Sequence, residues 1–444
     1  MGSNSNSIET MQRNLKNKFL APAIVALALL PGCGGGNDRK NPTDSTPDAD
    51  KGLSLSFTKA PNAAVLESGL VGKPVFIADP GVLKDESGYH LFITNQFCDL
   101  NDNGQWDEGE HLFDADKTLP CVAERGVGAT MYAFSEDKGE TWSVRPAPAI
   151  EPGPAGWDDY NAETAFPFIH NDTLYVLYCA YGHKNGALFN TRYQIGLASL
   201  ALKGRTLKQA MVDDKATLAK INGGTQPLIT GNLTTSAYDN NTQEPSVVVT
   251  ESGFELFFTG LRLENPTVDM SPGNGNTISG IALVRQKFDF NWQKVGDWEV
   301  SQDLEGMTPS SEKLALAPVN IGEVHFHNGK YHIFYTTLEN AADFHSGERI
   351  AYAVSEDGLN WTGMRVILEP GSNESDFDGW GIMAPSVVFE DDQIVLFYSA
   401  WGNTDKSPCV MRGPGAKWGQ QVAGGSKCVH GNLGRATAVI QATQ

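Results

Sequence analysis

Short apolar, aromatic-rich runs alternate with polar turns along this chain, and one combination of the two recurs. A short extended segment, usually carrying a proline, leads through a polar turn into a strand rich in Tyr, Phe, Ile and Leu. Its five copies are centred on Pro80, Pro167, Pro245, Gly322 and Pro385. Repeats spaced by tens of residues are typical of one circular or stacked architecture, so we predict a single large domain.

Each of the first four aromatic strands is followed by a further strand-like run, at residues 129–134, 194–199, 280–285 and 349–354. Amphipathic helical periodicity is scarce, which indicates an all-β fold. Two runs lead into Asp-box turns, Ser135–Trp142 and Ser355–Trp361, where the Asp should cap backbone N–H groups while the Trp packs between strands. Strand-like segments at 53–57 and 435–440 predict that the first and last strands close one sheet.

The N-terminal region has the features of a targeting segment. Basic residues precede an apolar stretch over 19–30, which is too short to cross a bilayer as a stable helix. It ends in Leu30-Pro31-Gly32-Cys33, which resembles a bacterial lipobox and implies a lipidated Cys33; an ordinary secretory signal is the alternative. Residues 34–52 are polar and rich in Gly, Pro, Ser and Asp, as in a flexible tether.

We therefore predict a lipoprotein signal peptide over 1–33, a tether over 34–52 and a folded domain over 53–444. The protein would be exported and lipid-anchored to the cell envelope. The outer membrane is favoured because Gly34 rather than Asp follows Cys33. With an ordinary signal, the protein would instead be periplasmic or secreted.

Acidic residues outnumber basic ones, with 53 Asp and Glu against 33 Lys and Arg and a formal net charge of −20. Nucleic-acid binding requires clustered cations, so this composition argues against it. We expect a monomer that contacts the membrane only through the lipid anchor. Its ligands would be calcium or neutral molecules.

Residues 99–110 fit the twelve-residue calcium loop of EF-hands. Gly104 stands at the sixth position, where the loop turns sharply. The ligands would be Asp99, Asn101, Asn103, Gln105 (through its carbonyl), Asp107 and Glu110. No helical pattern flanks the loop, so we predict a structural calcium site inserted after the first repeat; a solvated acidic turn is the alternative.

The cysteines other than Cys33 include two candidate disulfide pairs. An oxidising compartment would allow both pairs to form. They are Cys98 with Cys121, which flank the calcium insertion, and Cys409 with Cys428, which flank a Gly-rich segment. Cys179 lies in an apolar strand and is expected to be a buried free thiol.

Three motifs taken in order carry a family resemblance: Ala78-Asp79-Pro80 before a Gly-Tyr-x-Leu strand, Gln243-Glu244-Pro245, and the strand and turn over 350–361. Together they resemble the five-bladed β-propeller glycoside hydrolases, namely the arabinanase/β-xylosidase and invertase/levansucrase families. The resemblance implies a five-bladed propeller that cleaves a poly- or oligosaccharide with paired carboxylates. Glu244 would be the general acid. Asp79 would be the base of an inverting enzyme or the nucleophile of a retaining one, and both modes stay open.

The second repeat departs from the pattern of these families, which places an Asp beside the proline of that strand. Here the sequence is Phe166-Pro167-Phe168, and Glu163 is the nearest substitute. This departure keeps open a non-catalytic propeller that binds a glycan or a surface partner. The Asp-boxes also suggest a sialidase, but five repeats rather than six argue against that class.

Candidate sugar contacts lie outside the carboxylate pair. Aromatic–Asp pairs occur at Trp157-Asp158, Tyr238-Asp239 and Phe377-Asp378, with Trp380 close by. On a propeller rim they would stack on a sugar and accept its hydroxyls; turns with a capping Asp are the alternative. In the fourth repeat Glu323, His325 and His327 share one face of a strand. His325 is the best candidate there for substrate or metal binding, and an ordinary satisfied polar side chain is the alternative.

Overall fold

The computed structural model describes residues 52–60, 64–66, 77–98, 111–112, 126–153, 156–159, 161–182, 193–231, 241–263, 278–306, 318–338, 348–373, 376–379, 381–403, 410–412 and 427–440. Regular structure in these ranges is nearly all β, which confirms the predicted class. Two short helical turns occur there, Lys208–Asp213 and Ile221–Gly224. No helix within the same ranges is both long and apolar enough to cross a membrane.

The described strands form five antiparallel groups. The first group is β2 (Ala78–Asp85), β3 (Gly88–Cys98), β5 (Gly126–Ser135) and β6 (Ser143–Val144), with β4 (His111–Leu112) beside β3. The second is β7 (Asn161–His170), β8 (Thr173–Tyr181), β9 (Gln194–Ala201) and β10 (Ala219–Lys220). A single parallel bridge between Gly128 and Asn161 joins these two groups into one hydrogen-bonded sheet.

The remaining three groups are separate sheets. The third group is β11 (Asn241–Val249), β12 (Phe254–Leu263), β13 (Ile278–Phe288) and β14 (Lys294–Gly306). The fourth is β15 (Pro318–His327), β16 (Lys330–Leu338), β17 (Glu348–Ser355) and β18 (Trp361–Leu368). The fifth is β19 (Gly381–Phe389), β20 (Gln393–Asn403), β22 (Lys427–Val439) and β1 (Thr58–Lys59), with β21 (Val410–Arg412) beside β22.

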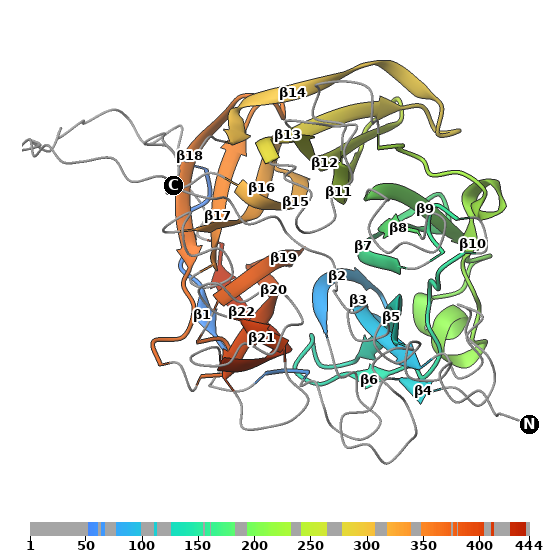
Figure 1. The fold of residues 1–444 in the computed structure, drawn as a ribbon, viewed down its shortest axis with the longest axis horizontal. Helices are drawn as coiled ribbons and strands as arrows, with labels where there is room; N and C mark the ends of the chain where they lie inside the picture. Colours follow the sequence, from blue (N-terminus) through green and yellow to red (C-terminus); the bar gives the residue numbers. More distant parts are fainter. Residues whose placement is uncertain are drawn as a thin grey trace, which may run out of the picture.

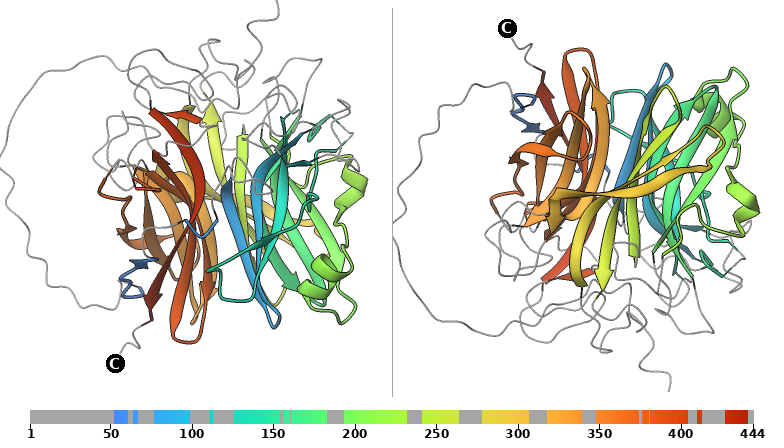
Figure 2. Two further views of the ribbon diagram at one scale, coloured as in Figure 1. Left: turned by 90° about the horizontal axis from the view of Figure 1, so that it is seen from below. Right: turned by 90° about the horizontal axis from the view of Figure 1, so that it is seen from above.

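The groups surround a common axis (Figure 1), and their strands run lengthwise beside it (Figure 2). The first strand of each group, β2, β7, β11, β15 or β19, is innermost and contacts the first strand of the next group, so that the five make a closed ring. The N-terminal β1 pairs with the C-terminal β22, Thr58 opposite Thr437. The two ends of the domain therefore meet in one sheet, as predicted, but the first strand is Thr58–Lys59 and not the expected segment 53–57.

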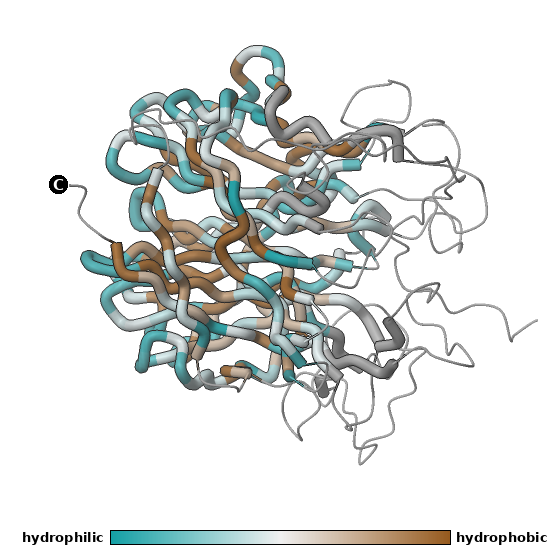
Figure 3. The backbone as a smooth tube through the Cα atoms, turned by 90° about the vertical axis from the view of Figure 1, so that its left-hand side faces the viewer, coloured by the Kyte–Doolittle hydropathy of each residue, from teal (hydrophilic) through white to brown (hydrophobic). Residues whose placement is uncertain are grey.

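Apolar side chains fill the space between neighbouring groups. Five buried clusters are present among the described residues, one at each of the five junctions around the ring. The hydropathy colouring shows the same alternation along the chain, with apolar stretches inside the strands and polar residues at many of the turns (Figure 3). Sheet-on-sheet burial around the whole ring is the main source of stability that this architecture offers.

The two Asp-boxes act as predicted. In the first, Asp137 accepts the backbone N–H and hydroxyl of Thr141, and Trp142 packs edge-on against Phe397 of the fifth group with ring centroids 5.7 Å apart. Burial alone would raise the pKa of Asp137, but the hydrogen bonds from Thr141 and Ser135 outweigh it and lower the pKa to about 2. The second box caps its turn in the same way through Asp357. These turns are structural.

Each innermost strand carries a β-bulge, where its register against the second strand of its group slips. Four bulge residues have a left-handed backbone, with φ of 51° at Asp79, 50° at Thr164, 54° at Glu244 and 48° at Ala384. Non-glycine residues seldom adopt this conformation, and such strain gathers at functional sites. Because a bulge re-aims the side chain of its residue, the bulges determine what faces the axis.

A repeated hydrogen bond fixes these bulges. The backbone N–H of a bulge residue donates to a hydroxyl or thiol on the second strand of the preceding group. The four contacts are Asp79 N to Ser399 Oγ at 2.7 Å, Thr164 N to Thr94 Oγ1 at 2.9 Å, Glu244 N to Cys179 Sγ at 2.9 Å and Ala384 N to Thr336 Oγ1 at 3.0 Å. The bulges are thus held by the neighbouring group as well as by their own, which ties the site geometry to closure of the ring.

Several predictions from the sequence lie outside the described residues. The signal peptide over 1–33 with Cys33, most of the tether over 34–52 and the calcium loop over 99–110 are among them. The same holds for Cys121 and Cys409, and for the side chains of Cys98 and Cys428. Cys179, in contrast, is described and is a buried free thiol, as predicted.

Candidate active site

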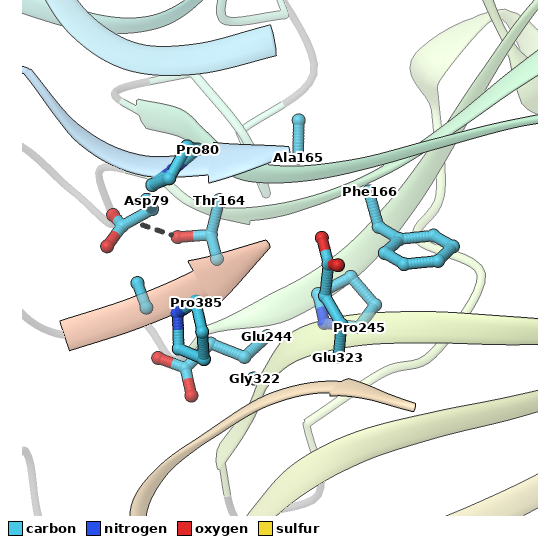
Figure 4. Close-up of a pocket in the computed structure, with 11 residues that line it drawn as sticks. Asp79, Pro80, Thr164, Ala165, Phe166, Glu244, Pro245, Gly322, Glu323 and Pro385 are labelled. Atoms are coloured by element: carbon cyan, nitrogen blue, oxygen red, sulfur yellow. Dashed lines mark hydrogen bonds between the residues drawn. The ribbon is translucent and has the colours of Figure 1, made fainter. Parts of the chain in front are cut away.

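A cavity lies on the axis, where the bulges of the innermost strands meet (Figure 4). It contains about 340 Å³ of space not filled by atoms, a volume that includes open solvent. Its lining comes from all five innermost strands, through Asp79, Pro80, Thr164, Ala165, Phe166, Glu244, Pro245, Gly322, Glu323, Ala384 and Pro385. The predicted pair Asp79 and Glu244 therefore shares one cavity. In Figure 4 both carboxyl groups lie on one side of it, and Glu323 points to the other side.

Asp79 is held by hydroxyl groups. Its Oδ2 accepts the hydroxyl of Thr94 on β3 at 3.3 Å and that of Thr164 on β7 at 3.2 Å. Its backbone N–H is fixed by Ser399. Hydrogen bonds donated to a carboxylate favour its ionised form. Such an environment suits a base or a nucleophile.

Glu244 is held from two neighbouring strands. Its Oε2 accepts the hydroxyl of Thr259 on β12 at 3.0 Å, and its backbone N–H donates to the buried thiol of Cys179. Burial and the charges of Glu244, Glu163 and Asp79 raise the pKa of that thiol well above its usual value, so Cys179 stays neutral. All three carboxylates thus lie close enough to Cys179 to act on one buried group.

Glu163, on β7, is a third carboxyl group near Asp79 and Glu244. Burial raises the pKa of Glu163, the Asp79 carboxylate raises it further, and hydrogen bonds with Tyr193 and Asn161 partly offset both, giving about 7. The predicted substitute carboxylate is therefore next to Asp79 and is partly protonated at neutral pH.

The equivalence predicted for the second repeat is wrong. The repeat pattern equates Pro167 with Pro80 and Pro245, but the register places the bulge of β7 at Thr164 and Ala165, with Pro167 two residues beyond. Thr164 is thus the counterpart of Asp79 and Glu244. Neither proline nor glycine stands at residues 164 and 165, so the sequence of β7 offers no signal that marks this bulge.

Glu323 and His325 lie in the fourth group. Nε2 of His325 is 2.9 Å from Oε2 of Glu323, and the same oxygen accepts the backbone N–H of Val387. The ring of Phe166 packs against that of His325, with centroids 6.2 Å apart. No group of three His, Cys, Asp or Glu side chains with the arrangement of a metal site occurs in the described part of the chain. His325 therefore has a carboxylate partner, which fits the structural interpretation of this stripe.

Two aromatic–Asp pairs are described, and both of their carboxylates are buried. Oδ2 of Asp158 accepts from Tyr178 at 3.2 Å and from Lys220 at 2.6 Å. Asp378 has the same partners in the fifth group, namely the hydroxyl of Tyr398 at 3.2 Å and the ammonium of Lys59 at 2.6 Å. These ion pairs neutralise the two buried carboxylates, which supports the structural interpretation of the pairs over sugar binding.

The remaining sugar-contact candidates are resolved only in part. The indole of Trp157 is buried and donates to the carbonyl of Gly224 at 2.7 Å. Asp239 and Trp380 lie outside the described residues.

Thr94, Thr164 and Thr259, which hold the paired carboxylates, were not predicted from the sequence. The hydrogen-bond partner of a threonine in a strand cannot be inferred until the neighbouring strand is known.

Comparison with known proteins agrees with this architecture. Residues 321–416 match the model of the glycosyl hydrolases family 32 N-terminal domain. A solved structure of a BT0996–RGII complex is 12% identical and superposes with a TM-score of 0.51, over 84% of this chain and 91% of the other. The fold is that of a glycoside hydrolase-like β-propeller.

Two further solved structures similar to this propeller have TM-scores below 0.5. One is an N-acetylgalactosamine deacetylase from F. plautii in complex with blood group B trisaccharide, with 15% identity, a TM-score of 0.49 and coverage of 88% of this chain and 95% of that one. Another is a thermostable family-43 glycoside hydrolase, with 16% identity, a TM-score of 0.47 and coverage of 83% and 93%. No curated protein matches the sequence.

Proposed function

We propose that this chain is a five-bladed propeller, each antiparallel group being one blade, and that it hydrolyses glycosidic bonds in a poly- or oligosaccharide. The observation that carries the proposal is the single axial cavity lined by both Asp79 and Glu244. Glycoside hydrolysis needs two carboxyl groups on either side of one bond, and two blades on different sides of an axis supply them. The family match over 321–416 supports the same class of reaction.

The surroundings of the two carboxyls support different roles. Asp79 receives two threonine hydroxyls and is the base or nucleophile. Glu244 receives one from Thr259 and is the acid that protonates the leaving oxygen. Glu163, partly protonated beside Asp79, adjusts the charge of the site. A neutral sugar would enter from the side to which the Asp79 and Glu244 carboxyls point.

Substitution of each carboxyl tests the proposal. The full chain and the variants Asp79→Asn and Glu244→Gln are incubated with a panel of plant, algal and host polysaccharides, and release of reducing ends is measured. We expect turnover by the full chain and losses of about 10³-fold or more in both variants, since each removes a group that acts in the transition state. Turnover that both variants retain would end the enzymatic proposal. Saccharide binding without turnover would leave the binding propeller as the function.

The first-formed anomer separates the two catalytic modes. Proton NMR during early turnover reports whether the product retains or inverts the configuration. Retention would make Asp79 a nucleophile with carboxyls about 5–5.5 Å apart, and inversion would make it a base with a water between carboxyls about 6.5–9.5 Å apart.

The calcium loop and the lipid anchor remain proposals. The strands on either side of the predicted loop, β3 and β4, pair with each other, with Cys98 opposite His111. The chain thus leaves and re-enters the sheet at one point, as an inserted calcium loop would require. Calcium should raise the melting temperature of the full chain, and Asp99→Ala with Glu110→Ala should remove that rise.

Metabolic labelling with a fatty-acid probe tests the lipid anchor. The parent chain should be labelled, and the variant Cys33→Ala should not.

A further inference from the structure

Thr164 is in a conformation that its side chain disfavours. Its φ is 50°, in the left-handed region, and a β-branched residue there is a genuine outlier. Glycine or asparagine would occupy the same bulge at lower conformational cost. A strained residue is retained only where the surrounding structure enforces it, and an observed outlier is a reason to look for a function.

The strained backbone brings Thr164 into a closed set of hydrogen bonds with two other strands. Its N–H donates to Oγ1 of Thr94 at 2.9 Å, and its own hydroxyl donates to Oδ2 of Asp79 at 3.2 Å. Because Thr94 Oγ1 accepts from Thr164, the hydroxyl proton of Thr94 is free to point to the same Oδ2, 3.3 Å away. Three strands, β2, β3 and β7, thus converge on one carboxylate oxygen (Figure 4 shows the contact between Thr164 and Asp79).

The position of Thr164 in the ring makes this arrangement specific. Its counterparts in the first and third groups are Asp79 and Glu244, so a bulge that carries a carboxylate elsewhere carries a hydroxyl donor here. Asp79 already faces like charge from Glu163 on β7, and Glu244 on β11 lines the same cavity. A neutral donor stabilises an ionised Asp79 without adding to the negative charge of the site.

We propose that Thr164 is a positioning residue for Asp79. The hydroxyl of Thr164 holds the Asp79 carboxylate in its reactive orientation. This inference rests on the proposed function, in which Asp79 is the base or nucleophile. The strain at Thr164 is then the conformational cost of bringing a hydroxyl from the second blade to the carboxylate of Asp79 in the first.

Two substitutions at the same position separate the hydroxyl from the shape of the side chain. Thr164→Val keeps the β-branched shape and removes the donor, whereas Thr164→Ser keeps the donor and removes the branch. We expect Thr164→Val to lower kcat by roughly 10- to 100-fold, the scale of a misplaced catalytic group, and Thr164→Ser to stay within about threefold of the parent. Thr173→Val, at the far end of β8, is the matched control and should leave kcat unchanged.

Two results for the kcat values of these variants would overturn the proposal. If Thr164→Val is as active as the parent, or if Thr164→Ser is as impaired as Thr164→Val, the side chain serves packing and does not position Asp79. Because both variants keep a residue of similar size, a melting temperature within a few degrees of the parent confirms that either result comes from a folded protein.

A double-mutant cycle tests the contact without any turnover. Urea unfolding is measured for the parent, Thr164→Val, Asp79→Ala and the double variant. Alanine removes the acceptor that asparagine would keep, so we expect the midpoint shift caused by Thr164→Val to shrink by at least half in the Asp79→Ala background. Additive shifts would refute the contact, whereas absence of turnover by the parent would refute the proposed function. The two failures are therefore distinguishable.

Discussion

Glu163 offers a direct test of the electrostatics of the site. Its pKa in the folded protein is about 7, against an ordinary value of 4.5, because burial and Asp79 disfavour its charged form. The difference is about 2.5 pKa units, and each unit corresponds to about 1.4 kcal/mol. Ionisation of Glu163 should therefore reduce the free energy of unfolding by at most about 3.5 kcal/mol.

The sign follows from proton linkage. Between pH 4.5 and 7 the folded protein retains a proton on Glu163 that the unfolded chain has lost, so stability falls as the pH rises through this window. Below pH 4.5 the contribution is fully retained, and above pH 7 the deficit is constant. Glu163→Gln keeps the shape and cannot ionise, so its stability relative to the parent should rise across the window and level off near pH 8.

Urea unfolding of the parent and Glu163→Gln at intervals from pH 4 to 9 measures this difference. We expect the gap between the two free energies to change by about 3 kcal/mol from the lowest to the highest pH, whatever constant offset the substitution itself causes. Glu251→Gln, on an exposed turn, is the control and should follow the parent throughout. Parallel curves for the parent and Glu163→Gln would refute the placement of Glu163 beside Asp79.

Three further outcomes follow from the packing around the ring. Gly81→Ala should destabilise the fold by at least about 2 kcal/mol in urea unfolding, because its new Cβ would lie 1.9 Å from the carbonyl oxygen of Ala165; an unchanged midpoint would contradict this close approach. Lys220→Met should cost about 3–5 kcal/mol by leaving buried Asp158 without its cation, and Lys220→Arg should cost much less. Cys179→Ser keeps an acceptor for the bulge N–H and should be nearly neutral, whereas Cys179→Val should cost about 1–3 kcal/mol; equal effects would mean that the thiol is only a space-filler.

The fold could be predicted from the sequence because its signals are local. Prolines mark the bulges of three innermost strands, at Pro80, Pro245 and Pro385, since a bulge tolerates the missing N–H that a regular ladder does not. The Asp-boxes are equally local, because the Asp and the backbone that it caps lie within one turn. The same reasoning misplaced the bulge of β7, where a proline at 167 follows a bulge that has none.

The site could be predicted only in outline. Asp79 and Glu244 were found because each stands directly before a bulge proline. Their threonine partners could not be found, because each hydrogen bond depends on register with a second strand or on the neighbouring group. The ion-pair partners of Asp158 and Asp378 could not be predicted for the same reason. Their cations, Lys220 and Lys59, are remote in sequence, and only the three-dimensional arrangement shows that the carboxylates are buried and neutralised.

The pairing of β1 with β22 has a consequence for how the chain acquires its structure. Thr58 and Thr437, at opposite ends of the domain, are neighbours in one sheet, so the annulus cannot be completed until almost the whole polypeptide is available. Contacts of such high sequence separation slow folding, and the unfinished ring leaves a sheet edge unprotected. Because the backbone of Asp79 is anchored by Ser399 in that last sheet, the axial cavity is assembled at the final step. A truncated or nascent chain would therefore have no organised Asp79, and the proposed hydrolytic activity would require completion of the circle.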